Sequence, residues 1–187
     1  ELKNSPAKII SVVPSQTELL FDLGLENEVI GITKFCIHPE EWFRTKTRIG
    51  GTKKLNLEKI LQLQPDIIFA NKEENVKEEI ELLAKDYPVW VTDIASLNDA
   101  LNMINVIGEL TSTQPQADAL IIQIKNNFKQ IYSPFTINTC YLIWQGPYMT
   151  VGSDTFIHDM MEQCGFKNVF ADKKRYPEVS IEDLNER

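Results

Sequence analysis

Short β-branched segments alternate with amphipathic helical patterns over residues 8–93, and this alternation is what most limits the fold. Runs of four to seven apolar or β-branched residues predict buried strands. The predicted strands cover residues 8–14, 28–33, 65–70 and 88–93, and the helical patterns between them cover 15–25, 56–64 and 75–86. The order β-α-β-α-β-α-β predicts an α/β fold with a parallel, doubly wound sheet.

Local signals place the boundaries of these elements. Ser15 and Glu18 have the spacing of a capping box at a helix start, and Gly24 is a typical helix end. Asn56 is a suitable cap for the second helix. Residues 34–54 contain Pro39 and a Gly–Gly pair, and we expect a long loop there. Trp42 and Trp90 are predicted to be core residues.

The pattern changes after residue 95. Residues 96–132 read almost entirely as helix, and strands are expected to resume at 139–145. Ser153 is interpreted as the cap of a later helix. The helical segment 113–133 contains no glycine, and such a helix between two α/β regions predicts a rigid connection.

The second α/β region repeats the first. The segment "SVVPSQTELLFDLGLENEVIGIT" resembles "MTVGSDTFIHDMMEQCGFKNVFAD", and "LNLEKI" later resembles "VSIEDL". Two matches in the same order predict two related lobes. The predicted division is 1–112 for the first lobe, 113–133 for the connecting helix and 134–187 for the second lobe.

Composition excludes some classes of function. The chain is 43% hydrophobic with a net charge of −8, which argues against nucleic-acid binding. No apolar run is long enough to span a bilayer. The polar residues 1–8 do not resemble a signal peptide, so the protein is either cytosolic or has lost a leader. Three widely spaced cysteines form no disulfide framework.

Four motifs together resemble the substrate-binding proteins of ABC importers for iron chelates, haem and cobalamin. They are "IISVVPSQTELLFDLGL", "RIGGTKKLNLEKILQLQPDIIFA", "TVGSDTFIHDMMEQCGF" and "YPEVSIEDL". The resemblance implies two lobes joined by one long helix, a ligand cleft between them and little hinge motion. It also implies a monomer that is periplasmic or membrane-anchored, is not an enzyme and needs no cofactor. Because family members continue with further strands after "VSIEDL", we expect the second lobe to be incomplete.

Glu58 and Glu182 occupy equivalent places in the two copies. The resemblance implies that each docks onto an arginine of a dimeric membrane permease. A carboxylate in the first turn of a helix is favoured by the helix dipole, which suits an exposed contact. The same fact supports the alternative that glutamate is simply favoured at that position.

Ligand contacts are expected in the loops that follow the carboxyl ends of the strands. Aromatic side chains there would supply flat walls for a macrocycle or an aromatic chelate. The candidates are Ser15, Gln16, Phe35, Cys36, His38, Thr52, Lys53, Asn71, Lys72, Trp144, Tyr148 and Tyr176.

The chain departs from the cobalamin-binding members of the family at two positions. Those members have tryptophans where this chain has Thr52 and Asn71, beside Lys53, Lys54 and Lys72. Lysines would favour an anionic ligand, such as a carboxylate-bearing chelate, haem or a charged corrinoid. The alternative is that these lysines are ordinary solvated side chains.

Direct metal binding and catalysis have weaker signals. Cys36 and His38 are two residues apart and could ligate a metal, but no further His or Cys cluster supports a closed site. Nucleophile-elbow, Walker A and dinucleotide-binding motifs are lacking. The alternative function is a cytosolic α/β enzyme or a corrinoid-handling protein on the same scaffold.

Overall fold

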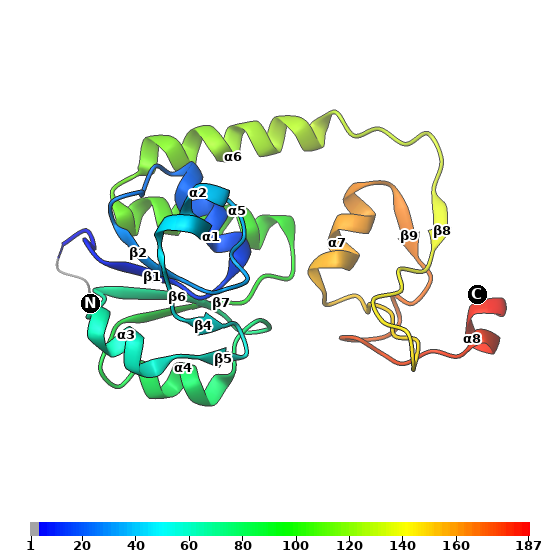
Figure 1. The fold of residues 1–187 in the computed structure, drawn as a ribbon. Coiled ribbons are helices and arrows are strands. Elements are labelled where there is room, and N and C mark those ends of the chain that lie inside the picture. Colours follow the sequence, from blue (N-terminus) through cyan, green and yellow to red (C-terminus); the bar gives the residue numbers. More distant parts are fainter. Residues whose placement is uncertain (1–3) are drawn as a thin grey trace. The chain divides into compact units, whose positions relative to one another are not determined.

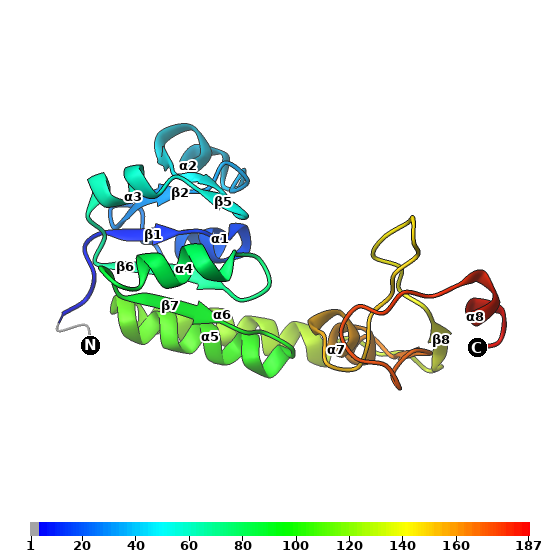
Figure 2. The same cartoon turned by 90° about the horizontal axis from the view of Figure 1, so that it is seen from below.

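The computed structural model describes residues 4–187, and the chain separates into two compact units (Figures 1 and 2). The first unit holds the chain up to Asp93 together with Met103–Leu120. The second unit holds Ile94–Asn102 and Ile121–Arg187. The division passes through helices α5 (Leu97–Thr111) and α6 (Gln114–Lys129). Residues 1–3, with which the predicted first lobe begins, lie outside the described part, and the predicted lobe boundaries stay a prediction.

The first unit is built on a five-stranded parallel sheet, as the alternation predicts. The strand order is β3-β2-β1-β6-β7. The first three strands therefore lie in the order β1, β2, β3 from the centre to one edge. Strand β6 pairs with the other side of β1, and β7 forms the opposite edge. The strands are β1 (Ile9–Ser11), β2 (Val29–Ile32), β3 (Thr47–Arg48), β6 (Ile67–Asn71) and β7 (Val89–Thr92).

Helices cover both faces of this sheet because strands β1 and β6 are apolar on both sides. Figure 1 shows α1 (Pro14–Asp22) and α5 against one face and α3 (Leu57–Leu63) and α4 (Lys77–Leu83) against the other. The core on the α3–α4 side includes Ile10, Ile49, Ile60, Ile68, Ile80 and Leu83.

Two sequence predictions for this unit are wrong. Helix α1 begins at Pro14, and Val13 occupies the N-cap position with no side-chain bond, so Ser15 and Glu18 form no capping box. Proline is favoured at the first helical position because its missing N–H is not needed there. The expected loop at 34–54 instead contains α2 (Glu40–Thr45), β3 and the hairpin strands β4 (Gly50–Gly51) and β5 (Lys54–Leu55).

Helices α5 and α6 approach closely within the first unit. A Cβ atom added to Gly108 would lie 2.5 Å from the Cβ atom of Ala117, so no larger residue fits between the two backbones. Beside this contact, the Gln114 Nε2 atom donates to the Asn105 Oδ1 atom at 2.9 Å.

The second unit has a smaller parallel pair of strands, β8 (Ile137–Thr139) and β9 (Phe166–Asn168), with α7 (Phe156–Gln163) between them in sequence. Helix α8 (Ile181–Asn185) follows. The expected strand at 139–145 is wrong, because β8 ends at Thr139. The expected cap at Ser153 is also wrong: the N-cap is Thr155, whose hydroxyl oxygen accepts from the His158 N–H at 3.3 Å.

The start of α5 is held inside the second unit by helix α7. The Leu97 N–H donates to the Asp159 carboxylate at 2.7 Å, so a side chain of α7 caps α5. In the part of the chain that the structure describes, every helix is too short or too polar to cross a membrane.

Candidate functional site

The turn after β1 places Ser15 and Gln16 very differently. Ser15 is exposed at the carboxyl end of the strand, where a ligand could reach it. Gln16 is buried, and its Nε2 atom donates to the Thr92 hydroxyl oxygen at 2.7 Å and to the Ala70 carbonyl oxygen at 3.3 Å. Gln16 therefore ties α1 to strands β6 and β7 and offers no exposed group to a ligand in this arrangement.

The loop after β2 contains Phe35, Cys36 and His38. Phe35 is 52% exposed, whereas Cys36 is completely buried. The Cys36 Sγ atom lies 3.1 Å from the hydroxyl oxygens of both Thr17 and Thr33, so it belongs to a closed polar cluster. This enclosure argues against the metal-binding interpretation of Cys36 with exposed His38. Within residues 4–187, no group of three or more His, Cys, Asp or Glu side chains could hold a metal ion.

The loop after β6 is shaped by Asn71 and Asn75. The Asn71 carboxamide oxygen accepts from the N–H groups of Glu73 and Glu74, at 2.9 and 3.1 Å, which closes a local turn. Asn75 is buried; its Oδ1 atom accepts from the Asn71 N–H at 2.8 Å. Its Nδ2 atom donates at 3.1 Å to the carbonyl oxygens of Val12 and Thr52.

Asn75 thus joins three segments that carry predicted site residues: the β1 turn, the β4–β5 hairpin and the β6 loop. Sequence reasoning did not select it, because a single Asn in a predicted helix looks like a surface residue. Thr52 is buried, with its carbonyl oxygen held by Asn75, and is not an open contact. Lys72 forms an ion pair with Asp93, so its charge is compensated.

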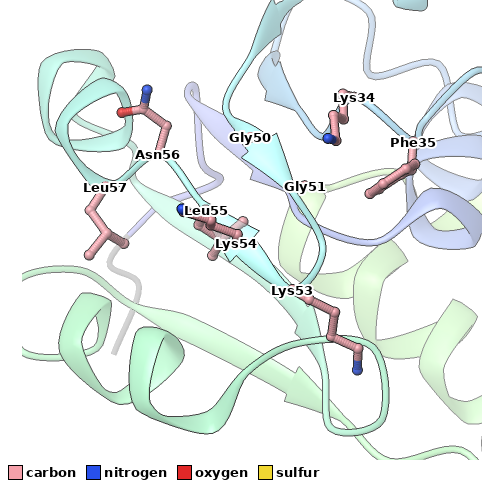
Figure 3. A pocket seen from close by; sticks show the side chains of 9 residues that line it. All are labelled: Lys34, Phe35, Gly50, Gly51, Lys53, Lys54, Leu55, Asn56 and Leu57. Carbon is pink, nitrogen blue, oxygen red and sulfur yellow. The ribbon is translucent and has the colours of Figure 1, made fainter.

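A pocket of about 690 Å³ opens beside the β4–β5 hairpin, and we call it the hairpin pocket (Figure 3). Two predicted residues, Phe35 and Lys53, meet there, together with Lys34, which sequence reasoning did not select. Its lining residues are Lys34, Phe35, Gly50, Gly51, Lys53, Lys54, Leu55, Asn56 and Leu57. Ser15, Asn71 and Lys72 do not line this pocket.

Glycine is required at the base of the hairpin pocket. Gly50 has a φ of +102°, and a Cβ atom there would lie 2.6 Å from the Lys54 carbonyl oxygen. At Gly51, a Cβ atom would lie 3.0 Å from the Phe35 ring, so the ring packs directly against the hairpin backbone. The Gly–Gly pair was the sequence signal for this site, although it predicted only a loop.

The predicted aromatic residues of the second unit lie on connected loops. Trp144 is 63% exposed, and its backbone pairs with Met149 across a tight turn. Tyr148 is half-buried, and its carbonyl oxygen accepts from the Val179 N–H at 2.9 Å. The Arg175 guanidinium lies 5.6 Å from the ring centre of half-buried Tyr176. Backbone bonds therefore hold the Tyr148 loop beside residues 177–179.

The loop before Tyr176 is held by Asp154. The Arg175 N–H donates to the Asp154 carboxylate at 2.5 Å, and this bond lowers the pKa of Asp154 below its ordinary value. The Gly152 N–H donates to the Arg175 carbonyl oxygen at 2.7 Å. The segment that carries Tyr176 is thus fixed by both side-chain and backbone bonds.

Glu58 and Glu182 occupy matching positions, each the second residue of its helix. Glu58 follows Asn56, whose side chain accepts from the Lys59 N–H at 3.0 Å. Glu182 follows Ser180, which forms a capping box with Asp183. The Ser180 N–H and hydroxyl bonds lower the pKa of Asp183 below its ordinary value. Both glutamates are exposed, and the predicted cap at Asn56 is confirmed.

Comparison with known proteins places these features in a family. The sequence matches the family described as "Periplasmic binding protein" over residues 9–187. The chain belongs to the periplasmic binding protein family. This agrees with the resemblance found in the sequence motifs and with the parallel α/β architecture.

Two relatives and one solved structure of the same fold show how far the likeness extends. An uncharacterized ABC transporter substrate-binding lipoprotein of Bacillus subtilis, YvrC, is 29% identical over 98% of this chain and 62% of its own length. The vitamin B12-binding protein of Vibrio parahaemolyticus is 24% identical over 98% of this chain and 69% of its own length. A periplasmic heme binding protein from Pseudomonas aeruginosa shares the fold, with a TM-score of 0.83 and 19% identity over 97% of this chain and 68% of that one. The chain spans less than two thirds of the first of these relatives.

Proposed function

We propose that this chain is part of the extracytoplasmic substrate-binding component of an ABC importer. It captures a metal chelate of the corrinoid, haem or ferric siderophore class and delivers it to a membrane permease. The observation that carries the proposal is the family match over residues 9–187. Relatives named as a substrate-binding lipoprotein, a vitamin B12-binding protein and a heme binding protein support both the location and the ligand class.

The geometry supports binding rather than catalysis. The exposed candidate groups include the aromatic rings of Phe35 and Trp144 and the ammonium group of Lys53. Such groups hold a flat or charged ligand by surface contact. The proposal needs no resident cofactor, since any metal arrives inside the ligand, and the protein acts as a monomer.

Ligand titrations test the proposal. Cobalamin, cobinamide, haemin and ferric siderophores are added to the protein while tryptophan fluorescence and heat release are recorded. We expect at least one chelate to bind with a Kd below about 10 μM, which is near −7 kcal/mol. The uptake function is refuted if every chelate binds more weakly than this.

A matched pair of variants connects binding to the exposed aromatic loop. Trp144→Ala removes a side chain that is 63% exposed, and Tyr132→Ala removes one that is 83% exposed but is not a candidate contact. We expect the tryptophan change to weaken chelate binding about tenfold, since a stacked aromatic contact contributes about 1–1.5 kcal/mol. The tyrosine change should leave the Kd within about twofold, which is below 0.5 kcal/mol.

Docking to the permease is tested separately with the exposed glutamates. The double variant Glu58→Ala/Glu182→Ala should lose association with the permease dimer in proteoliposomes and keep its ligand affinity. Glu78→Ala is the matched control, because Glu78 is also exposed in the first turn of a helix. Equal loss of association in the control would refute the specific role of the two glutamates.

A further inference from the structure

The hairpin pocket carries an excess of positive charge in a chain whose net charge is −8. Three of its lining residues are lysines, and its lining contains no carboxylate. The Lys34 Nζ atom lies 5.0 Å from the Phe35 ring centre, and the Lys53 Nζ atom donates to the Glu73 carbonyl oxygen. None of the three lysines forms an ion pair with a residue in the described range 4–187.

Three other cations of the first unit form ion pairs. Lys72 pairs with Asp93, Lys77 pairs with Glu81, and Arg44 pairs with Glu40. Lys46, Arg48 and Lys59 also have no ion pair within the described residues, so what sets the hairpin pocket apart is that three lysines share one lining without a carboxylate. The Glu79 carboxylate accepts from the Leu55 N–H at 2.9 Å and offsets part of the positive charge, whereas carboxylates more than about 8–10 Å away are screened at physiological ionic strength.

The apolar and charged groups of the pocket are held together. Figure 3 shows Lys34 and Phe35, from the loop after β2, beside the Gly50–Gly51 strand, with Lys54 on the returning strand. At Gly51, a Cβ atom would approach the Phe35 ring to 3.0 Å and the Lys34 side chain to 3.3 Å. The lack of a side chain at Gly51 thus lets an aromatic ring and an ammonium group lie over the same backbone segment.

We propose that the hairpin pocket binds an anionic oxygen group of the ligand, so that the chelate taken up carries carboxylate or phenolate charge next to an apolar ring. This inference rests on the proposed function and narrows its ligand class. A volume of about 690 Å³ accommodates such a portion of a ligand. Ammonium groups bind anionic oxygens as compact charges with rotatable donors, and the exposed Phe35 ring contacts the apolar part.

Ligand pairs that differ mainly in charge test the inference. One pair is dicyanocobyrinic acid and its heptamethyl ester, and the other is an anionic ferric tris-catecholate and cationic ferrioxamine. We expect the anionic member of at least one pair to bind at least about tenfold more tightly at low salt, from three contacts of two- to threefold each. This difference in affinity between the two members should decrease as the salt concentration is raised.

Lysine variants assign that preference to the pocket. The triple variant Lys34→Gln/Lys53→Gln/Lys54→Gln should bind the anionic ligand about tenfold more weakly and the uncharged ester equally well. A control triple variant, Lys8→Gln/Lys59→Gln/Lys85→Gln, makes the same change in net charge at exposed positions outside the pocket. It should weaken anion binding by about twofold or less.

The outcomes separate this inference from the function on which it rests. If none of these four ligands and none of the chelates in the titrations above binds, the uptake function is refuted and the anion preference falls with it; if another chelate binds and none of these four does, only the anion preference is refuted. If both members of each pair bind equally, or if the control triple weakens binding as much as the pocket triple, only the anion preference is refuted. Unfolding curves of both triples establish that the comparison is made between folded proteins.

Discussion

Replacement of Asn75 by alanine tests whether one buried side chain holds the loops of the first unit together. Asn75 accepts one hydrogen bond from the Asn71 N–H and donates two, to the carbonyl oxygens of Val12 and Thr52. Each intramolecular hydrogen bond contributes a net free energy of about 1 kcal/mol, and a buried group left without a partner costs more. We therefore expect Asn75→Ala to lower the free energy of unfolding by about 3 kcal/mol.

The assay is urea unfolding followed by tryptophan fluorescence in a Trp144→Phe background. Trp42 and Trp90 then report on the first unit alone, because Trp144 is the tryptophan of the second unit. Asn27→Ala, at an exposed position of the first unit, is the control and should change the free energy of unfolding by less than about 0.5 kcal/mol.

A second variant separates hydrogen bonding from packing. Asn75→Asp keeps the shape of the side chain but places a carboxylate oxygen against two carbonyl oxygens. It should destabilise the first unit at least as much as alanine does, because both donors are lost and like partial charges meet. A loss below about 1 kcal/mol in both variants would refute the reasoning.

Three further predictions concern other described contacts. Because Thr155 caps α7, Thr155→Ala should lower the free energy of unfolding by about 1 kcal/mol, and Ser153→Ala should lower it by less than about 0.5 kcal/mol. Urea unfolding measures both values, and equal losses would contradict the assignment of the cap. Gly50→Ala should lower the free energy of unfolding by about 1–3 kcal/mol more than Gly24→Ala does. Both glycines have positive φ, but only Gly50 has backbone atoms within 3 Å of an added Cβ, and equal shifts of the urea midpoint would disprove the steric argument. The lowered pKa of Asp154 means that its stabilisation is present above pH 3.8 and is lost as pH falls through the folded-state pKa. Asp154→Asn should therefore have a lower free energy of unfolding than the wild type above pH 3.8, and the difference should disappear in more acidic solution. Unfolding curves recorded over a range of acid pH values measure this difference.

The order of the elements could be predicted from the sequence because it depends on local patterns. Apolar β-branched runs define strands β1, β2, β6 and β7, and the caps Asn56 and Ser180 act through bonds within their own helices. The wrong caps show the limit of such patterns. Ser15 and Ser153 have suitable spacing, but the helix starts are set by Pro14 and Thr155.

The site was less predictable, because its contacts join segments distant in sequence. Burial of Gln16 and Cys36 follows from packing against residues such as Thr92 and Thr17, which periodicity does not reveal. The role of Asn75 depends on Val12, 63 residues away. By contrast, Phe35, Trp144 and the two glutamates were selected as exposed groups in loops and first turns, and they are exposed.

The division of the chain within α5 and α6 has a consequence for fragments of this protein. The first unit needs Met103–Leu120, whereas the second needs Ile94–Asn102, which precedes that segment. A break at any single peptide bond therefore leaves at least one unit without part of its own chain. During synthesis, likewise, the first unit cannot be completed until residues of the second have already been made.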